Sequence, residues 1–134
     1  MAWQTKRLPA AFDLLAPDGS QIRELVHVER GSMVHCTLRR GEVTQAMRHG
    51  TVEELWYCVA GAGEVWRSDG VHEEVVQLRP GVSLTIPCGV SFQFRAHDKA
   101  LELLITTMPP WPGAAEAEPV QGVWPATAAS GDGS

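Results

Sequence analysis

Short runs in which apolar and polar positions alternate fill residues 22–108, and turn-forming residues separate them. In one run, Val34, Cys36 and Leu38 alternate with polar side chains, as in a strand with one buried face. An Asp-Gly pair at 69–70 is a typical two-residue hairpin turn. We find no helical period sustained over three turns, so the pattern predicts an all-β sandwich or barrel. The expected strands are 22–29, 32–39, 43–49, 54–60, 64–68, 72–78, 83–86, 91–96 and 101–108.

The two ends of the chain differ from this central block, residues 21–108, which we expect to form one barrel domain. Residues 1–20 are interrupted by prolines and are predicted to form an irregular N-terminal arm. Residues 109–134 are dense in proline, alanine and glycine and are predicted to form a C-terminal extension. Trp111 is expected to hold this extension on the barrel or on a partner subunit. From Ala126 the composition predicts a disordered end.

Composition excludes several classes of partner. The net charge of −5 argues against a nucleic-acid partner, because a phosphate backbone would be repelled. No apolar run approaches the roughly 20 residues of a membrane helix, so no membrane partner is expected. The three cysteines are odd in number and far apart in the chain, which predicts reduced thiols in a cytoplasmic protein.

Two stretches place glycines, prolines and polar residues at recognisable spacings. The first begins at Gly41 and contains His49 and Glu54, with four residues between them and six more before Gly61. The second, residues 81–92, reads glycine, five residues, Pro-x-Gly, two residues, phenylalanine. Both stretches resemble the two motifs of the cupin superfamily. The resemblance implies a cupin-type double-stranded β-helix: an antiparallel jelly-roll barrel with a pocket between its two sheets and almost no helix.

The resemblance also implies a metal site, from which this chain departs. Cupins typically hold a metal with three histidines and one glutamate, and His49 and Glu54 match two of these four positions. Met47 and Phe92 stand where the first and third histidines belong. A catalytic zinc ion usually has at least three protein ligands, and thioether sulfur suits only soft metals. We therefore expect either no cofactor or one weakly held divalent metal ion.

Strand alternation indicates which side chains share a pocket with His49 and Glu54. An inward-pointing His49 would place Gln45 on its own face, where the amide oxygen could complete a metal site with His49 and Glu54. Glu53 is an alternative inward carboxylate, although the count to the closing glycine favours Glu54. The candidate pocket residues are Gln45, Met47, Trp56, Cys58, Phe92 and Phe94.

Without a metal, a buried carboxylate must find another partner. We therefore predict a hydrogen bond between His49 and Glu54, with the two acting as a catalytic acid–base pair. The alternative is that His49 and Glu54 only satisfy each other's hydrogen-bonding groups inside the barrel. The aromatic pocket residues would then belong to the hydrophobic core.

Three functions remain open. The first is a small-molecule-binding cupin that acts as an isomerase, epimerase or lyase through the histidine–glutamate pair. The second is a metal-free, non-catalytic cupin that binds or senses a small ligand. The third is a metal-dependent, dioxygenase-like cupin with a rebuilt ligand shell. Barrels of this kind protect their edge strands by pairing, so we expect a homodimer in which residues 1–20 or 109–125 cross to the partner.

Overall fold

The computed structural model describes residues 3–133, and strands make up most of their regular structure. No α-helix occurs in this part of the chain, and nothing in it is a helix long and apolar enough to cross a membrane. The elements are β1 (Leu14–Leu15), β2 (Gln21–Val28), β3 (Gly31–Leu38), β4 (Met47–His49), β5 (Glu53–Ala60), β6 (Gly63–Ser68), β7 (Glu73–Leu78), β8 (Ser83–Ile86), β9 (Ser91–Ala96), β10 (Leu101–Met108), the 3₁₀ turn η1 (Ala114–Glu116) and β11 (Ala117–Pro119).

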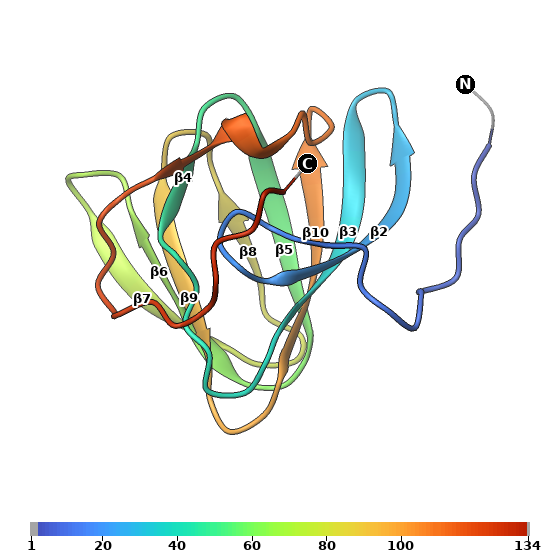
Figure 1. Ribbon diagram of the computed structural model, residues 1–134. Helices are drawn as coiled ribbons and strands as arrows, with labels where there is room; N and C mark the ends of the chain where they lie inside the picture. The colour runs from blue at the N-terminus through green and yellow to red at the C-terminus, as the bar shows by residue number, and fades with distance from the viewer. Residues whose placement is uncertain (1–2, 134) are drawn as a thin grey trace.

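The strands form two antiparallel sheets that face each other (Figure 1). The first sheet has the order β1-β2-β3-β10-β5-β8, and the second has the order β11-β4-β9-β6-β7. Most neighbours in each sheet are distant in sequence, because the chain passes repeatedly from one sheet to the other. These crossings produce the predicted jelly-roll barrel.

Side-chain alternation builds the core between the sheets. In β5, exposed and buried residues alternate from Glu53 to Val59, so Trp56 and Cys58 point inward. Leu103 of β10 adds to this inner face, and Phe94 of β9 faces it from the second sheet. All four of these inward residues are buried in one apolar cluster, which stabilises the barrel by removing hydrophobic surface from water.

Two glycines allow a tight reversal between β5 and β6. Gly61 has φ of 86°, a conformation that side chains other than glycine rarely adopt. Gly63 has no positive φ, but a Cβ at this position would overlap the carbonyl oxygen of Arg95. One glycine is therefore required by backbone conformation and the other by close packing.

The strand predicted at residues 43–49 is shorter than expected. Only Met47–His49 forms β4, and Val43 makes a single bridge to Arg95. The backbone N–H of Gln45 donates to the carbonyl oxygen of Asp18, in the loop before β2. This bond to another segment interrupts the ladder, so strand alternation does not extend back to Gln45.

The end of the C-terminal extension is packed, in contrast to the predicted disorder. Ala128 is buried, and its N–H donates to the carbonyl oxygen of Val43. The N–H of Gly131 donates to the carbonyl oxygen of Ala16. A Cβ at Gly131 would overlap that backbone, so only a segment of small residues fits here. The small residues that predicted disorder therefore allow close packing.

The N-terminal arm runs outside β2 (Figure 1). The Arg23 guanidinium donates to the carbonyl oxygens of Pro9 and Ala10, which fixes the middle of the arm. Trp3 is fully exposed, and Phe12 is also exposed. The homodimer in which residues 1–20 or 109–125 cross to a partner stays a prediction.

Candidate functional site

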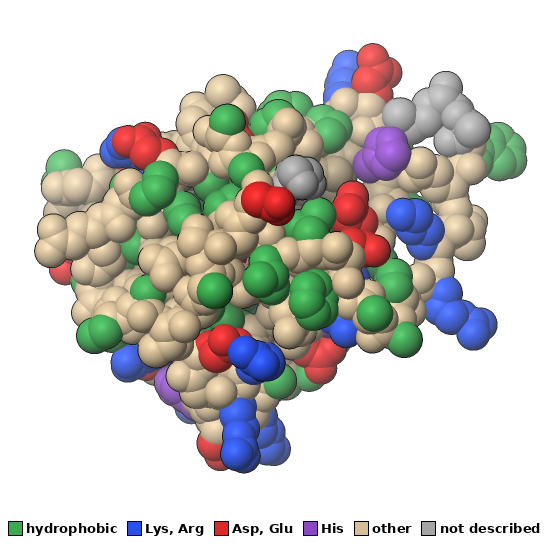
Figure 2. Space-filling view, viewed as in Figure 1, with side chains coloured by type: hydrophobic (Ala, Val, Ile, Leu, Met, Phe, Trp, Pro, Cys, Tyr) green, Lys and Arg blue, Asp and Glu red, His purple; other side chains and the backbone are tan. Residues whose placement is uncertain are grey.

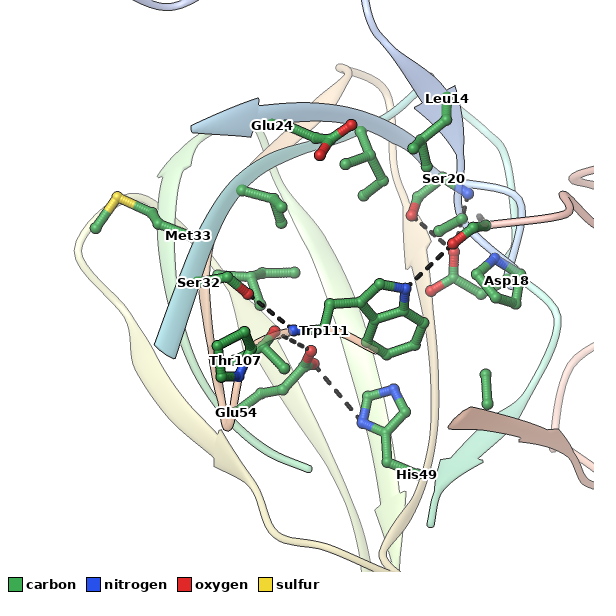
Figure 3. A pocket seen from close by; sticks show the side chains of 18 of the residues that line it. Leu14, Asp18, Ser20, Glu24, Ser32, Met33, His49, Glu54, Thr107 and Trp111 are labelled. Carbon is green, nitrogen blue, oxygen red and sulfur yellow. Dashed lines mark hydrogen bonds and ion pairs between the residues drawn. The ribbon is translucent and has the colours of Figure 1, made fainter. Parts of the chain in front are cut away.

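A cavity of about 420 Å³ opens at one end of the barrel, between the two sheets. This volume lies in the usual range for small-molecule sites. The lining residues come from β1, β2, β3, β4, β5, β9 and β10, and also from the loop before β2 and the segment after β10. Figure 3 shows polar side chains from these elements around the indole ring of Trp111.

Glu54 is the inward carboxylate of β5, and Glu53 is exposed. The Oε1 atom of Glu54 accepts a hydrogen bond from Trp56 Nε1 at 3.0 Å, and its Oε2 atom accepts one from Thr107 Oγ1 at 2.7 Å. Trp56 lies two residues away on the same strand face, and Thr107 is the partner of Glu54 in the register of β5 and β10. Two neutral donors therefore hold the buried carboxylate in one orientation.

His49 ends β4 and is 4% exposed. Its Nδ1 lies 4.0 Å from Glu54 Oε1, which is too long for a hydrogen bond. The predicted His49–Glu54 hydrogen bond is therefore wrong, because Trp56 and Thr107 already donate to the carboxylate. Within the described part of the chain, Nδ1 of His49 has no hydrogen-bond partner.

Aromatic rings hold the imidazole of His49 on two sides. The Phe92 ring packs edge-on at 5.1 Å between centroids, and the Trp111 ring does so at 5.4 Å. Trp111 is itself fixed, because its N–H donates to Ser32 Oγ and its indole Nε1 donates to the carbonyl oxygen of Gly133. The sequence predicted that Trp111 would lie on the barrel or on a partner subunit, but not that it would contact His49.

Asp18 is a second buried carboxyl group at the cavity, and sequence reasoning missed it. Its Oδ1 accepts hydrogen bonds from the N–H and the hydroxyl of Ser20, at 2.9 Å and 2.7 Å. Burial raises the pKa of Asp18, the Ser20 bonds offset this in part, and nearby Glu54 raises it further. Asp18 lies in the segment that the sequence predicted to be an irregular arm, and its Asp-Gly pair is a turn signal that gives no sign of a cavity.

Five of the predicted pocket residues meet at this cavity: Met47, His49, Glu54, Trp56 and Phe92. Met47 and Phe92 are direct partners in the register of β4 and β9, so the two apolar replacements lie side by side. These positions come from both sequence motifs and meet in one cavity between the sheets, as the alignment of the two motifs with those of the cupins implies.

Three predicted pocket residues lie elsewhere. Cys58 and Phe94 belong to the core two residues further along their strands, where the Trp56 ring packs against Phe94 and separates it from the cavity. Gln45 does not line the cavity, because its side-chain amide donates to the carbonyl oxygen of Ala128. Gln45 precedes β4, and so the alternation that would aim it inward does not apply.

The metal-ligating side chains at this cavity do not fit the metal site that the cupin resemblance implies. His49 and Glu54 are the two matching donors, and both Glu54 oxygens accept hydrogen bonds from the protein. Gln45, the predicted third donor, points away. In residues 3–133 no three His, Cys, Asp or Glu side chains are grouped to hold a metal ion. We therefore derive no chemical step through a metal.

Glu116 supports the loop that follows His49. Its carboxylate accepts hydrogen bonds from the Thr51 hydroxyl at 2.6 Å and the Val52 N–H at 2.7 Å, and also one from the Thr51 N–H. Burial alone would raise the pKa of Glu116, but these bonds outweigh it and leave the pKa below its usual value.

Glu116 is therefore expected to make stability depend on acid pH. Its contribution is fully present above the usual glutamate pKa and is lost as pH falls through the lower folded-state pKa. Thermal melts between pH 7 and pH 3 should show a smaller acid-induced loss for Glu116→Gln than for the unmodified protein. The matched change at exposed Glu73 should leave the pH dependence as it was. Parallel melting curves for the native protein and Glu116→Gln would contradict this role.

Comparison with known proteins gives a family. The model of the cupin domain matches residues 34–107, more than half of the chain. No curated protein matches at a significant level.

Three solved structures show the same fold. KdgF from Halomonas sp. has a TM-score of 0.64 at 22% identity, over 78% of this chain and 96% of that one. Oxalate decarboxylase from Bacillus subtilis has a TM-score of 0.70 at 16% identity, over 89% of this chain and 33% of that one. The nucleoside dehydratase Pac13 has a TM-score of 0.68 at 15% identity, over 90% of this chain and 95% of that one. At these identities the likeness is one of fold alone. The match of the cupin-domain model over more than half of the chain shows that this chain belongs to the cupins.

Proposed function

We propose that this cupin binds a small organic molecule in the barrel cavity and moves a proton on it through His49. The observation that carries the proposal is the position of His49, which lines a cavity of ligand size while its buried Nδ1 has no hydrogen-bond partner among the described residues and lies 4.0 Å from Glu54 Oε1. Buried polar atoms without partners are rare in folded proteins, and one on a residue that lines a cavity is a sign of function.

Glu54 suits a role as electrostatic partner to His49. Its Oε1 lies 4.0 Å from Nδ1, close enough to stabilise the positive charge that His49 gains when it accepts a proton. The donors Trp56 and Thr107 hold this carboxylate in place, so it needs no rearrangement as the charge develops. Apolar walls around the pair strengthen the interaction by excluding water.

The reaction classes that fit are isomerisation, epimerisation and elimination. Each needs a group that removes a proton from the substrate, and the imidazole of His49 can accept it. An elimination is consistent with the dehydratase activity named for Pac13, which has the same fold. That likeness concerns fold, and the argument for this chain rests on His49 and Glu54.

Proton NMR in D₂O tests the proposal. The native protein is incubated with a panel of small carbonyl compounds and β-hydroxy ketones, and deuterium incorporation and loss of water are followed. At least one compound should react, and His49→Gln should abolish the reaction while the matched change at exposed His72 preserves it. Reaction that persists in His49→Gln would overturn the role of His49.

A non-catalytic binding or sensing cupin is the second candidate function. The indole of Trp111 packs directly on His49, and Met47 and Phe92 add apolar surface beside it. These contacts are as well suited to binding an apolar ligand without reaction as they are to catalysis. In the same experiment this function would show compounds that shift cavity resonances, with no deuterium incorporation or loss of water.

A further inference from the structure

The cavity is acidic, and its acids come from three separate elements. Asp18 lies in the loop before β2, Glu24 lies on β2, and Glu54 lies on β5. His27 and His49 are the other titratable lining residues, and no lysine or arginine lines the cavity in the described part of the chain. Figure 2 shows that lysine and arginine side chains lie mainly towards the edges of this face.

The Asp18 carboxylate has one oxygen available to a ligand. Both Ser20 bonds go to Oδ1, and no described residue donates to Oδ2 through a hydrogen bond. Asp18 is 9% exposed, and Figure 3 shows its carboxylate directed towards the Trp111 indole in the middle of the cavity. Burial raises the pKa of Asp18 because it disfavours the charged carboxylate, so a bound cation would lower this pKa by stabilising the charge.

Charge and aromatic surface together favour one class of ligand. A carboxylate or phosphate would bring a further negative charge to an acidic, partly desolvated cavity without a lysine or arginine to offset it. A cation would instead be attracted by Asp18 and Glu54. Trp56, Phe92 and Trp111 line the same space, and aromatic rings attract cations and pack against flat apolar groups.

We infer that the cavity takes a small organic cation, an amine on a flat apolar body, with Asp18 as an additional residue that recognises its charge. This inference rests on the proposed function, which makes the cavity the ligand site. The Asp18 oxygen that accepts no hydrogen bond from the described residues is the separate sign that a positively charged group belongs there. Asp18 acts in recognition, while His49 acts in proton transfer.

Three probes of matched shape test the charge preference: phenethylamine, 2-phenylethanol and phenylacetate. Each is titrated into the full-length protein, and dissociation constants are taken from the shifts of cavity resonances in two-dimensional NMR. The amine should bind at least about tenfold more tightly than phenylacetate, with the alcohol between them. Asp18→Asn keeps the acceptor for Ser20 and should reduce this preference to about threefold or less.

Two further variants keep the test decisive. Glu24→Gln, at the exposed rim, should weaken amine binding even if Asp18→Asn is poorly folded. Glu29→Gln removes the same charge from an exposed position outside the cavity and should leave the preference unchanged.

Four results would overturn the inference. They are tighter binding of phenylacetate, equal binding of all three probes, no shift of cavity resonances with any probe, and displacement of the amine by Zn²⁺ or Mn²⁺. The proposed function fails separately, because a preference for the amine can persist when His49→Gln leaves turnover unchanged.

Discussion

Replacing His49 with glutamine is expected to lower turnover by about 100- to 10,000-fold, the usual contribution of a positioned acid–base group. Glutamine is similar in size and polar, but it cannot accept a proton at neutral pH. The ring contacts with Phe92 and Trp111 would be only partly replaced, so a moderate change in substrate affinity is also expected. The measurement is steady-state turnover of a compound found in the deuterium screen.

Two controls separate chemistry from folding in this experiment. Near-ultraviolet circular dichroism should show that His49→Gln retains the packed aromatic core. His72→Gln, an exposed histidine outside the cavity, should keep full turnover. Turnover of His49→Gln within about threefold of the native rate would show that another group moves the proton.

Replacing Trp56 with alanine is expected to lower the free energy of unfolding by about 3–5 kcal/mol, as for other large buried aromatic residues. Trp56 is 2% exposed, and its ring packs edge-on against Phe92 and Phe94. The substitution would also remove the donor to Glu54 Oε1. Urea denaturation followed by circular dichroism measures the loss.

Trp56→Phe divides this effect into packing and hydrogen bonding. Phenylalanine keeps most of the apolar contact but leaves Glu54 Oε1 without its donor, so a loss of about 1–3 kcal/mol is expected. Trp3→Ala, at a fully exposed position, should change stability by less than about 0.5 kcal/mol. If Trp56→Ala were no more destabilising than Trp3→Ala, the result would contradict the close packing of Trp56 inside the barrel.

Much of the barrel could be predicted because its signals are local. Alternating side chains and intervening turns located nine strands, and eight of them nearly coincide with the observed elements. The spacing of Glu54 from Gly61 correctly favoured Glu54 over Glu53 as the inward carboxylate. The two motifs also brought Met47 and Phe92 to the same cavity as His49.

The details of the site depend on contacts that no local pattern records. Thr107 reaches Glu54 through the pairing of β10 with β5, and it takes the place that the sequence assigned to His49. Asp18 and Trp111 lie in irregular segments at opposite ends of the chain, where side-chain direction has no period. Gln45 was misplaced because strand alternation was extended beyond the residues that form β4.

The central claim is that positions 47, 49, 54 and 92 converge in one cavity, and a designed metal site tests it most directly. Co²⁺ binding to Met47→His/Phe92→His is measured by visible absorption and calorimetry, with the native protein and Arg48→His/Phe92→His as controls. Arg48 pairs with Glu118 on the opposite side of β4, so that control moves one histidine away from the cavity. The account predicts that the first variant binds Co²⁺ at least about 100-fold more tightly than both controls, because only it brings three histidines and a carboxylate together. Equal affinity in all three proteins would contradict the convergence.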